Sequence, residues 1–167
     1  GTPSVKMLLS SGQVRCGEQI CLDVTSRGFT DILSFQYSIN WDAAVLGTAT
    51  VQQFSLAGLG AGNFNTEVAG VIRAGWTDAN VTGVTMAEDA VLFQICFDAI
   101  GNETANTVVQ FSSNPLPIEV LDGESNVAEV DLQNGNVSVV CPTVEPPIDT
   151  MDTNEGELAF ILSTTNG

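Results

Sequence analysis

Histidine does not occur anywhere among the 167 residues of the chain. Its absence excludes every mechanism that uses a Ser-His-Asp or Cys-His arrangement, and it removes the commonest zinc ligand. A glycosidase needs only two carboxylates. Most acidic residues here, however, fall in turns or on outward strand positions, where a solvated surface places them. We therefore predict that the protein is not an enzyme.

Basic residues are also scarce, with four Lys and Arg against twenty Asp and Glu and a formal net charge of −16. Binding to nucleic acid or to an anionic membrane surface requires clustered cations, which this chain lacks. No apolar run approaches the roughly 18 residues that a membrane span needs. The sequence thus predicts no nucleic-acid partner and no membrane insertion.

Four cysteines are present, and none forms a CxxC metal-binding pair. An even number spread from Cys16 to Cys141 predicts two disulfides in an oxidising compartment, with three connectivities possible. The alternative is four reduced, buried thiols in a cytosolic protein. The chain begins at Gly1 without a signal peptide, as expected of a mature secreted form or a trimmed chain. We expect a secreted or cell-surface protein.

Apolar and polar residues alternate with a period of two, and no segment has a helical period. The longest example is the run of Leu33, Phe35, Tyr37, Ile39 and Trp41, which alternates with polar residues. Shorter examples contain Ile20, Ile72, Phe93, Val109 and Val137, and Gly-containing turns separate them. This spacing is typical of an all-β antiparallel sandwich or jelly roll.

The composition changes after Cys141. We expect a β-sandwich over residues 1–141, an acidic, Pro-rich linker over 142–156 and an apolar strand segment over 157–167. An apolar run is unfavourable in water, and so we predict that this segment pairs as a strand. Its apolar residues are Leu158, Ala159, Phe160, Ile161 and Leu162.

The linker contains oxygen-bearing residues that invite comparison with a Ca²⁺ site. They are Asp149, Asp152 and Asn154, followed by Glu155 and Glu157. Their spacing lacks the Gly and the bidentate Glu of an EF-hand loop. We interpret them as a solvated linker and predict no cofactor.

Several stretches together resemble a cohesin module, the sandwich domain of cellulosome scaffolds and of many bacterial surface proteins. They are GEQICLDV, FQYSINWDAAVL, GVIRAGWTDANVTG, AVLFQICFDAIG, QFSSNPLPIEVLDG and NGNVSVV. The resemblance covers Val5 to about Val140. It implies a jelly roll of about nine strands, with sheets ordered 8-3-6-5 and 9-1-2-7-4. Among cohesin modules, those that contain cysteines resemble the ones found in secreted proteins of the Bacteroidetes group.

The resemblance also implies a disulfide pairing. In the cohesin strand order, the strand with Cys21 lies beside the strand with Cys96, and both cysteines have the outward parity. The first and last strands are neighbours as well. The implied pairs are Cys21–Cys96 and Cys16–Cys141.

In cellulosomal cohesins the 8-3-6-5 face binds a dockerin. Carried over to this sequence, that face would present small polar side chains and one cation. They are Ser34, Gln36, Ser38, Asn40, Arg73 and Thr77. The same residues would also suit a plain solvated sheet.

Possible modification sites complete the list of candidate residues. Asn80, Asn102 and Asn136 are in N-glycosylation sequons, and Thr150 lies in a three-residue pattern that resembles the O-glycosylation motif of Bacteroidetes.

Three functions compete. In the first, the apolar tail strand is donated to another copy of the chain, which would build a fibre or surface polymer. In the second, the polar sheet face recognises a dockerin-like protein. Carbohydrate binding is a third possibility, but it requires exposed aromatic residues, and both Trp have core parity.

Overall fold

The computed structural model describes residues 4–142. Several predicted features lie outside the described residues: the linker beyond Pro142, the strand segment 157–167 with Leu158–Leu162, the residues Asp149, Asp152 and Asn154, and Thr150.

Twelve strands and one short 3-10 helix make up the described part. In chain order they are β1 (Ser4–Leu9), β2 (Gly12–Arg15), β3 (Gln19–Arg27), β4 (Ile32–Asn40), β5 (Leu46–Gln52), η1 (Ala61–Asn63), β6 (Phe64–Asn65), β7 (Val71–Thr77), β8 (Ala90–Ala99), β9 (Ala105–Ser112), β10 (Glu119–Asp122), β11 (Glu129–Gln133) and β12 (Gly135–Val140).

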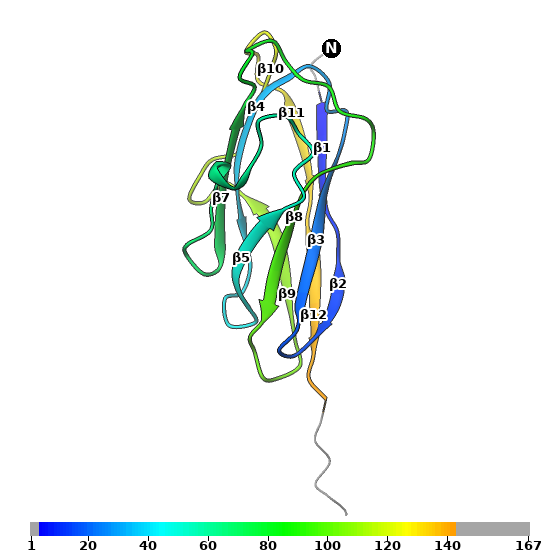
Figure 1. The fold of residues 1–167 in the computed structure, drawn as a ribbon, viewed down its shortest axis with the longest axis vertical. Helices are drawn as coiled ribbons and strands as arrows, with labels where there is room; N and C mark the ends of the chain where they lie inside the picture. The colour runs from blue at the N-terminus through cyan, green and yellow to red at the C-terminus, as the bar shows by residue number, and fades with distance from the viewer. Residues whose placement is uncertain (1–3, 143–167) are drawn as a thin grey trace, which may run out of the picture.

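The strands form two sheets that pack face to face in an elongated sandwich (Figure 1). The five-stranded sheet has the order β11-β1-β3-β8-β5. The seven-stranded sheet has the order β2-β12-β9-β4-β7-β6. β9 pairs with one end of β4, at Ser38–Asn40, and β10 pairs with the other end of β4, at Ile32–Gln36. The predicted all-β jelly-roll sandwich is confirmed, and both implied strand orders are present within these sheets.

The twelve strands correspond to the nine expected ones, because three of those are broken in two. The first strand forms β1 and β2, the eighth forms β9 and β10, and the last forms β11 and β12. The first and last strands each cross from one sheet to the other and stay paired in parallel on both sides of the crossing. At the crossing, a Cβ on Gly135 would overlap the carbonyl oxygen of Ser10, and glycine permits this close approach.

The core lies between the sheets and consists of the apolar residues whose alternation predicts strands. Leu33, Phe35, Tyr37, Ile39 and Trp41 are all buried. Their burial confirms the inward face of the longest predicted strand. The outward side chains of the same strand belong to the opposite, polar face of the sheet, which carries the candidate site.

Candidate partner-binding face

The seven-stranded sheet differs from the rest of the molecule in its charge. Its strands β2, β4, β6, β7, β9 and β12 contain no Asp or Glu, although the chain has twenty acidic residues. Their only charged residues are Arg15 and Arg73. Carboxylates occur at the rim, with Glu119 on β10 and Asp42 and Glu67 in loops. The outer face of this sheet, called the neutral face below, is therefore a hydrogen-bonding surface with few formal charges.

The predicted residues on β4 point to the neutral face, but they are not all free to contact a partner. Ser34, Gln36 and Asn40 are half-buried. Ser38 is fully buried, which corrects the expectation that the sheet would present it. The cause is a loop over residues 113–118, between β9 and β10, that lies across the strand.

This loop is fastened to β4 by side-chain hydrogen bonds. The Ser38 hydroxyl donates to the carbonyl oxygen of Leu116 at 3.0 Å and accepts from its backbone N–H at 2.7 Å. The side-chain amide of Gln36 donates to the carbonyl oxygen of Pro117, and that of Asn40 donates to the carbonyl oxygen of Asn114. The loop, called the flap below, is consequently part of the neutral face.

The β7 side of the neutral face is open. Arg73 and Thr77 are exposed, as the resemblance implies. Between them Gly75 has no side chain, and a Cβ built there would meet no atom within 4 Å. A shallow hollow beside it is lined by Ser34, Gln36 and Thr77, with Glu119 at its edge. Arg73 borders a second, polar hollow that includes Asn65 and Glu67.

The half of the neutral face formed by β9 and β12 contains no residue of the predicted set. Asn106 accepts hydrogen bonds from the side chains of Asn136 and Ser138, both at 2.9 Å. Val108, half exposed at 50%, and Gln110 continue the same row. Their alternation with buried Val109 and Val137 indicates that these residues point outward, although the predicted set contains only residues of β4 and β7.

Three of the four predicted glycosylation residues lie within the described part. Asn80 and Asn102 are exposed in loops, and Asn136 lies on the neutral face. Their modification stays a prediction.

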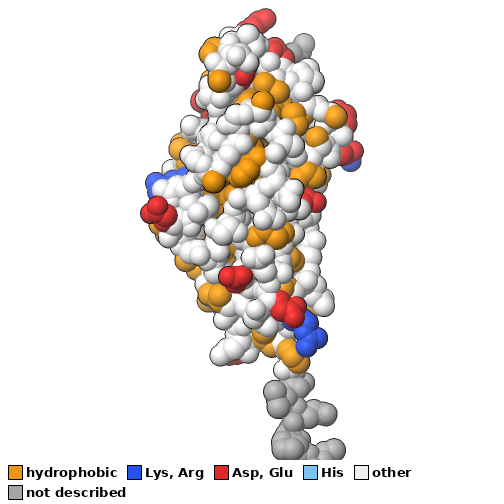
Figure 2. Space-filling view, in the orientation of Figure 1, with side chains coloured by type: hydrophobic (Ala, Val, Ile, Leu, Met, Phe, Trp, Pro, Cys, Tyr) orange, Lys and Arg blue, Asp and Glu red, His pale blue; other side chains and the backbone are white. Residues whose placement is uncertain are grey.

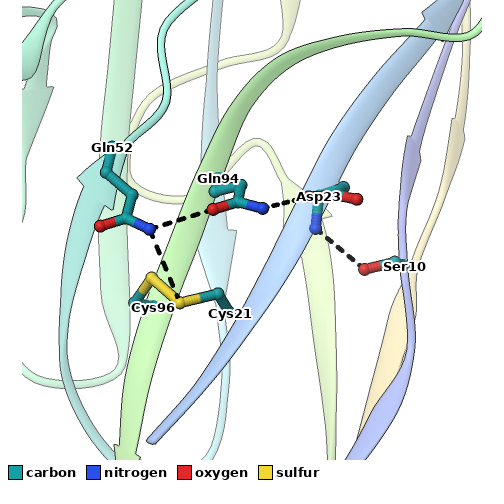
Figure 3. Close-up of a disulfide and its surroundings, with 6 residues drawn as sticks. All are labelled: Ser10, Cys21, Asp23, Gln52, Gln94 and Cys96. Carbon is teal, nitrogen blue, oxygen red and sulfur yellow. Dashed lines mark hydrogen bonds between the residues drawn. A yellow bond between two sulfur atoms is a disulfide. The ribbon is translucent and has the colours of Figure 1, made fainter.

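The opposite, five-stranded sheet carries one of the two disulfides on its outer face (Figure 3). Cys21 on β3 lies directly opposite Cys96 on β8 and is bonded to it. A chain of side-chain contacts runs beside it, from Gln52 to Gln94 at 3.0 Å and from Gln94 to Asp23 at 2.7 Å. The second disulfide joins Cys16 to Cys141. These are the two pairs that the resemblance implies.

Within residues 4–142 no group of three or more acidic or Cys residues is arranged to hold a metal ion. No helix in that part of the chain is long and apolar enough to cross a membrane.

Comparison with known proteins identifies a family. A sequence model described as the cohesin domain matches residues 5–139. No curated protein sequence matches the chain.

Several solved structures that are similar in fold are cohesins. The solution structure of CaCohA2 from Clostridium acetobutylicum is 21% identical, with a TM-score of 0.65 over 83% of this chain and 92% of that one. The cohesin in the Coh-OlpA–Doc918 complex from Clostridium thermocellum, described as a type I cohesin–dockerin complex, is 16% identical, with a TM-score of 0.68 over 82% and 99%. A non-cellulosomal cohesin from the archaeon Archaeoglobus fulgidus is 17% identical, with a TM-score of 0.64 over 82% and 91%.

Proposed function

The chain belongs to the cohesin family, and we propose that it is a recognition module that binds a dockerin-like protein through its neutral face. Cohesin domains are non-catalytic modules of protein interaction. Dockerin partners in several of the similar solved structures support this choice of partner class.

The observation that carries the proposal is the absence of carboxylates from six adjoining strands of a strongly acidic protein. A net charge of −16 repels other acidic proteins over the range of the Debye length, about 8 Å at physiological salt. The neutral face lets a partner approach without direct carboxylate repulsion. Its amides and hydroxyls supply hydrogen bonds, and specific interfaces typically contain about ten of them.

A matched pair of charge substitutions tests this assignment. Val108→Glu places a carboxylate on the neutral face, and Thr50→Glu places one at an exposed position on β5 of the other sheet. Each variant would be titrated by calorimetry against a dockerin selected for binding from a panel of purified dockerin domains. We expect Val108→Glu to weaken binding at least tenfold and Thr50→Glu to leave it unchanged. Equal effects of the two variants would contradict the proposed face.

Self-assembly through a donated C-terminal strand is a second proposal. It is supported by the apolar run Leu158–Leu162 and by an open sheet edge. Among the described strands β5 pairs only with β8, and its sequence LGTATVQ contains neither a charge nor a proline that would protect an edge. A neighbouring copy could add its strand there.

Deletion of residues 157–167 separates the two proposals. If the strand is donated, sedimentation of the full chain should show oligomers, and the truncated chain should be a monomer that still binds the selected dockerin. A full chain that stays monomeric at high concentration would contradict strand donation and leave the recognition proposal intact.

The division into a sandwich (1–141), linker (142–156) and strand segment (157–167) is part of the second proposal. We also propose that the protein acts outside the cell or at its surface. Its two disulfides agree with an oxidising compartment, and cohesins are typically extracellular.

A further inference from the structure

The first and last strand pairs run side by side along the length of the sandwich. From Ser4, β1 and β2 extend from one end of the molecule toward the other, and the described chain leaves at that far end after β12 (Figure 1). β11 and β12 accompany them in parallel, from Ser4 opposite Glu129 to Arg15 opposite Val140.

One disulfide joins these two paths where both end. Cys16 follows β2 directly, Cys141 follows β12 directly, and their Cα atoms are 5.0 Å apart. The shortest covalent route from Ser4 to Pro142 therefore passes along residues 4–16, through the disulfide and out at Cys141. All residues from 17 to 140 belong to a closed side loop.

We propose that the Cys16–Cys141 disulfide makes the domain a short covalent link that transmits tension past the fold. Tension applied across the chain would be carried by β1, β2 and the disulfide. The other ten strands, including almost all of the neutral face, lie in the side loop and are outside the tension path. This tension path is the same whichever partner the neutral face binds.

The link is also nearly inextensible. Residues in a strand already rise by about 3.3 Å each, close to the limit of about 3.6 Å for a stretched chain. The route from Ser4 to Pro142 contains about 15 residues, so its fully stretched length is only about 50 Å. Without any disulfide the same two residues would be joined by about 139 residues, or about 480 Å of chain.

The second disulfide provides a matched control, because Cys21 and Cys96 both lie inside the side loop. Its loss should leave the tension path unchanged. If it alone remains, the path from Ser4 to Pro142 contains about 65 residues, or about 220 Å.

Single-molecule force–extension measurement on the full chain, held at both termini, tests the proposal. The oxidised wild type and the Cys21→Ser/Cys96→Ser variant should both reach their limit at about 50 Å between Ser4 and Pro142, with no further extension as the force rises. The Cys16→Ser/Cys141→Ser variant should extend more than four times as far, to about 220 Å between Ser4 and Pro142. Residues 1–3 and 143–167 contribute equally to every measurement.

Should the Cys16→Ser/Cys141→Ser variant fail to fold, the wild type can be measured before and after addition of a thiol reductant to the same molecules. We expect reduction to release the full length of about 480 Å. The proposal is wrong if the oxidised wild type already releases that length. It is also wrong if the oxidised chain extends to about 300 Å, the length that Cys16–Cys21 and Cys96–Cys141 pairing would give.

Discussion

The two sheets of the sandwich turn different chemistry toward the solvent. Strands of the five-stranded sheet carry Asp23, Asp98, Glu129 and Asp131, together with Lys6 and Arg27. On the side seen in Figure 2, acidic side chains are spread as separate residues. Six of the seven strands in the other sheet carry no acid. In this strongly acidic protein, the candidate partner surface is therefore on the sheet most of whose strands lack acidic residues.

The inner faces differ as well. Behind the neutral face, aromatic rings pack in one layer. The ring of Phe35 is stacked on those of Tyr37 and Trp76, with centroid distances of 5.3 Å and 5.5 Å. The rings of Tyr37 and Phe111 meet edge to face, with their centroids 5.1 Å apart. Large rings with few rotatable bonds support a face whose shape is fixed before a partner arrives. The inner face of the five-stranded sheet is mostly aliphatic, apart from Phe93 and Phe97 on β8.

The largest expected effect comes from the two disulfides, one on the five-stranded sheet and one just beyond the ends of β2 and β12 in the seven-stranded sheet. Loss of either pair, by Cys16→Ser/Cys141→Ser or Cys21→Ser/Cys96→Ser, should lower the free energy of unfolding by about 4 to 5 kcal/mol, since each closes a long loop in the unfolded chain. Denaturant titration measures this loss.

Hydrogen exchange would show whether each disulfide acts on its own sheet. Loss of Cys21–Cys96 should speed exchange first in β3 and β8, and loss of Cys16–Cys141 first in β2 and β12. Identical exchange patterns in the two variants would contradict a separate role for each bridge.

A smaller effect is expected where the flap is fastened to the neutral face. Ser38→Ala leaves both the N–H and the carbonyl of Leu116 without their side-chain partner, which should cost about 1 to 3 kcal/mol of unfolding free energy. Ser34→Ala, four residues earlier on the same outward row, should change it by less than about 0.5 kcal/mol. Equal costs in denaturant titration would show that the flap does not depend on Ser38.

Alternation was sufficient to predict the sandwich and its inward residues, because a strand that is buried on one face must alternate. The outward parity of Cys21 and Cys96 followed from the same rule. The sheet order came only from the family resemblance, since strand pairing between distant segments leaves no local pattern.

The burial of Ser38 had no signal in its own strand. It results from the flap, which starts more than seventy residues later and crosses the face that the alternation marks as polar. The crossings of the first and last strands are similar, because they depend on a close approach of Gly135 to Ser10 across the whole chain. A period-two pattern reports which side of a strand is buried, and it carries no information on a loop that later covers the other side.

A smaller effect than the loss of the Ser38 hydroxyl is expected at Tyr37, in the aromatic layer behind the neutral face. Tyr37 is fully buried, and its hydroxyl has no hydrogen-bond partner among the described residues. Tyr37→Phe keeps the ring contacts with Phe35 and Phe111 and removes an unpaired buried polar group. We expect the free energy of unfolding to rise by about 1 kcal/mol at neutral pH in a denaturant titration.

The same residue gives the prediction a pH dependence. Burial raises the pKa of the Tyr37 phenol above its ordinary value of 10.0. The unfolded chain therefore releases this proton first, and the wild type should lose about 1.4 kcal/mol of unfolding free energy per pH unit above about pH 10, relative to Tyr37→Phe. Because the chain has a single tyrosine, phenolate absorbance reports this group alone. Phenolate formation near pH 10 in the still-folded protein would show that water reaches the hydroxyl. A wild type more stable than Tyr37→Phe at neutral pH would show that the hydroxyl has a hydrogen-bond partner.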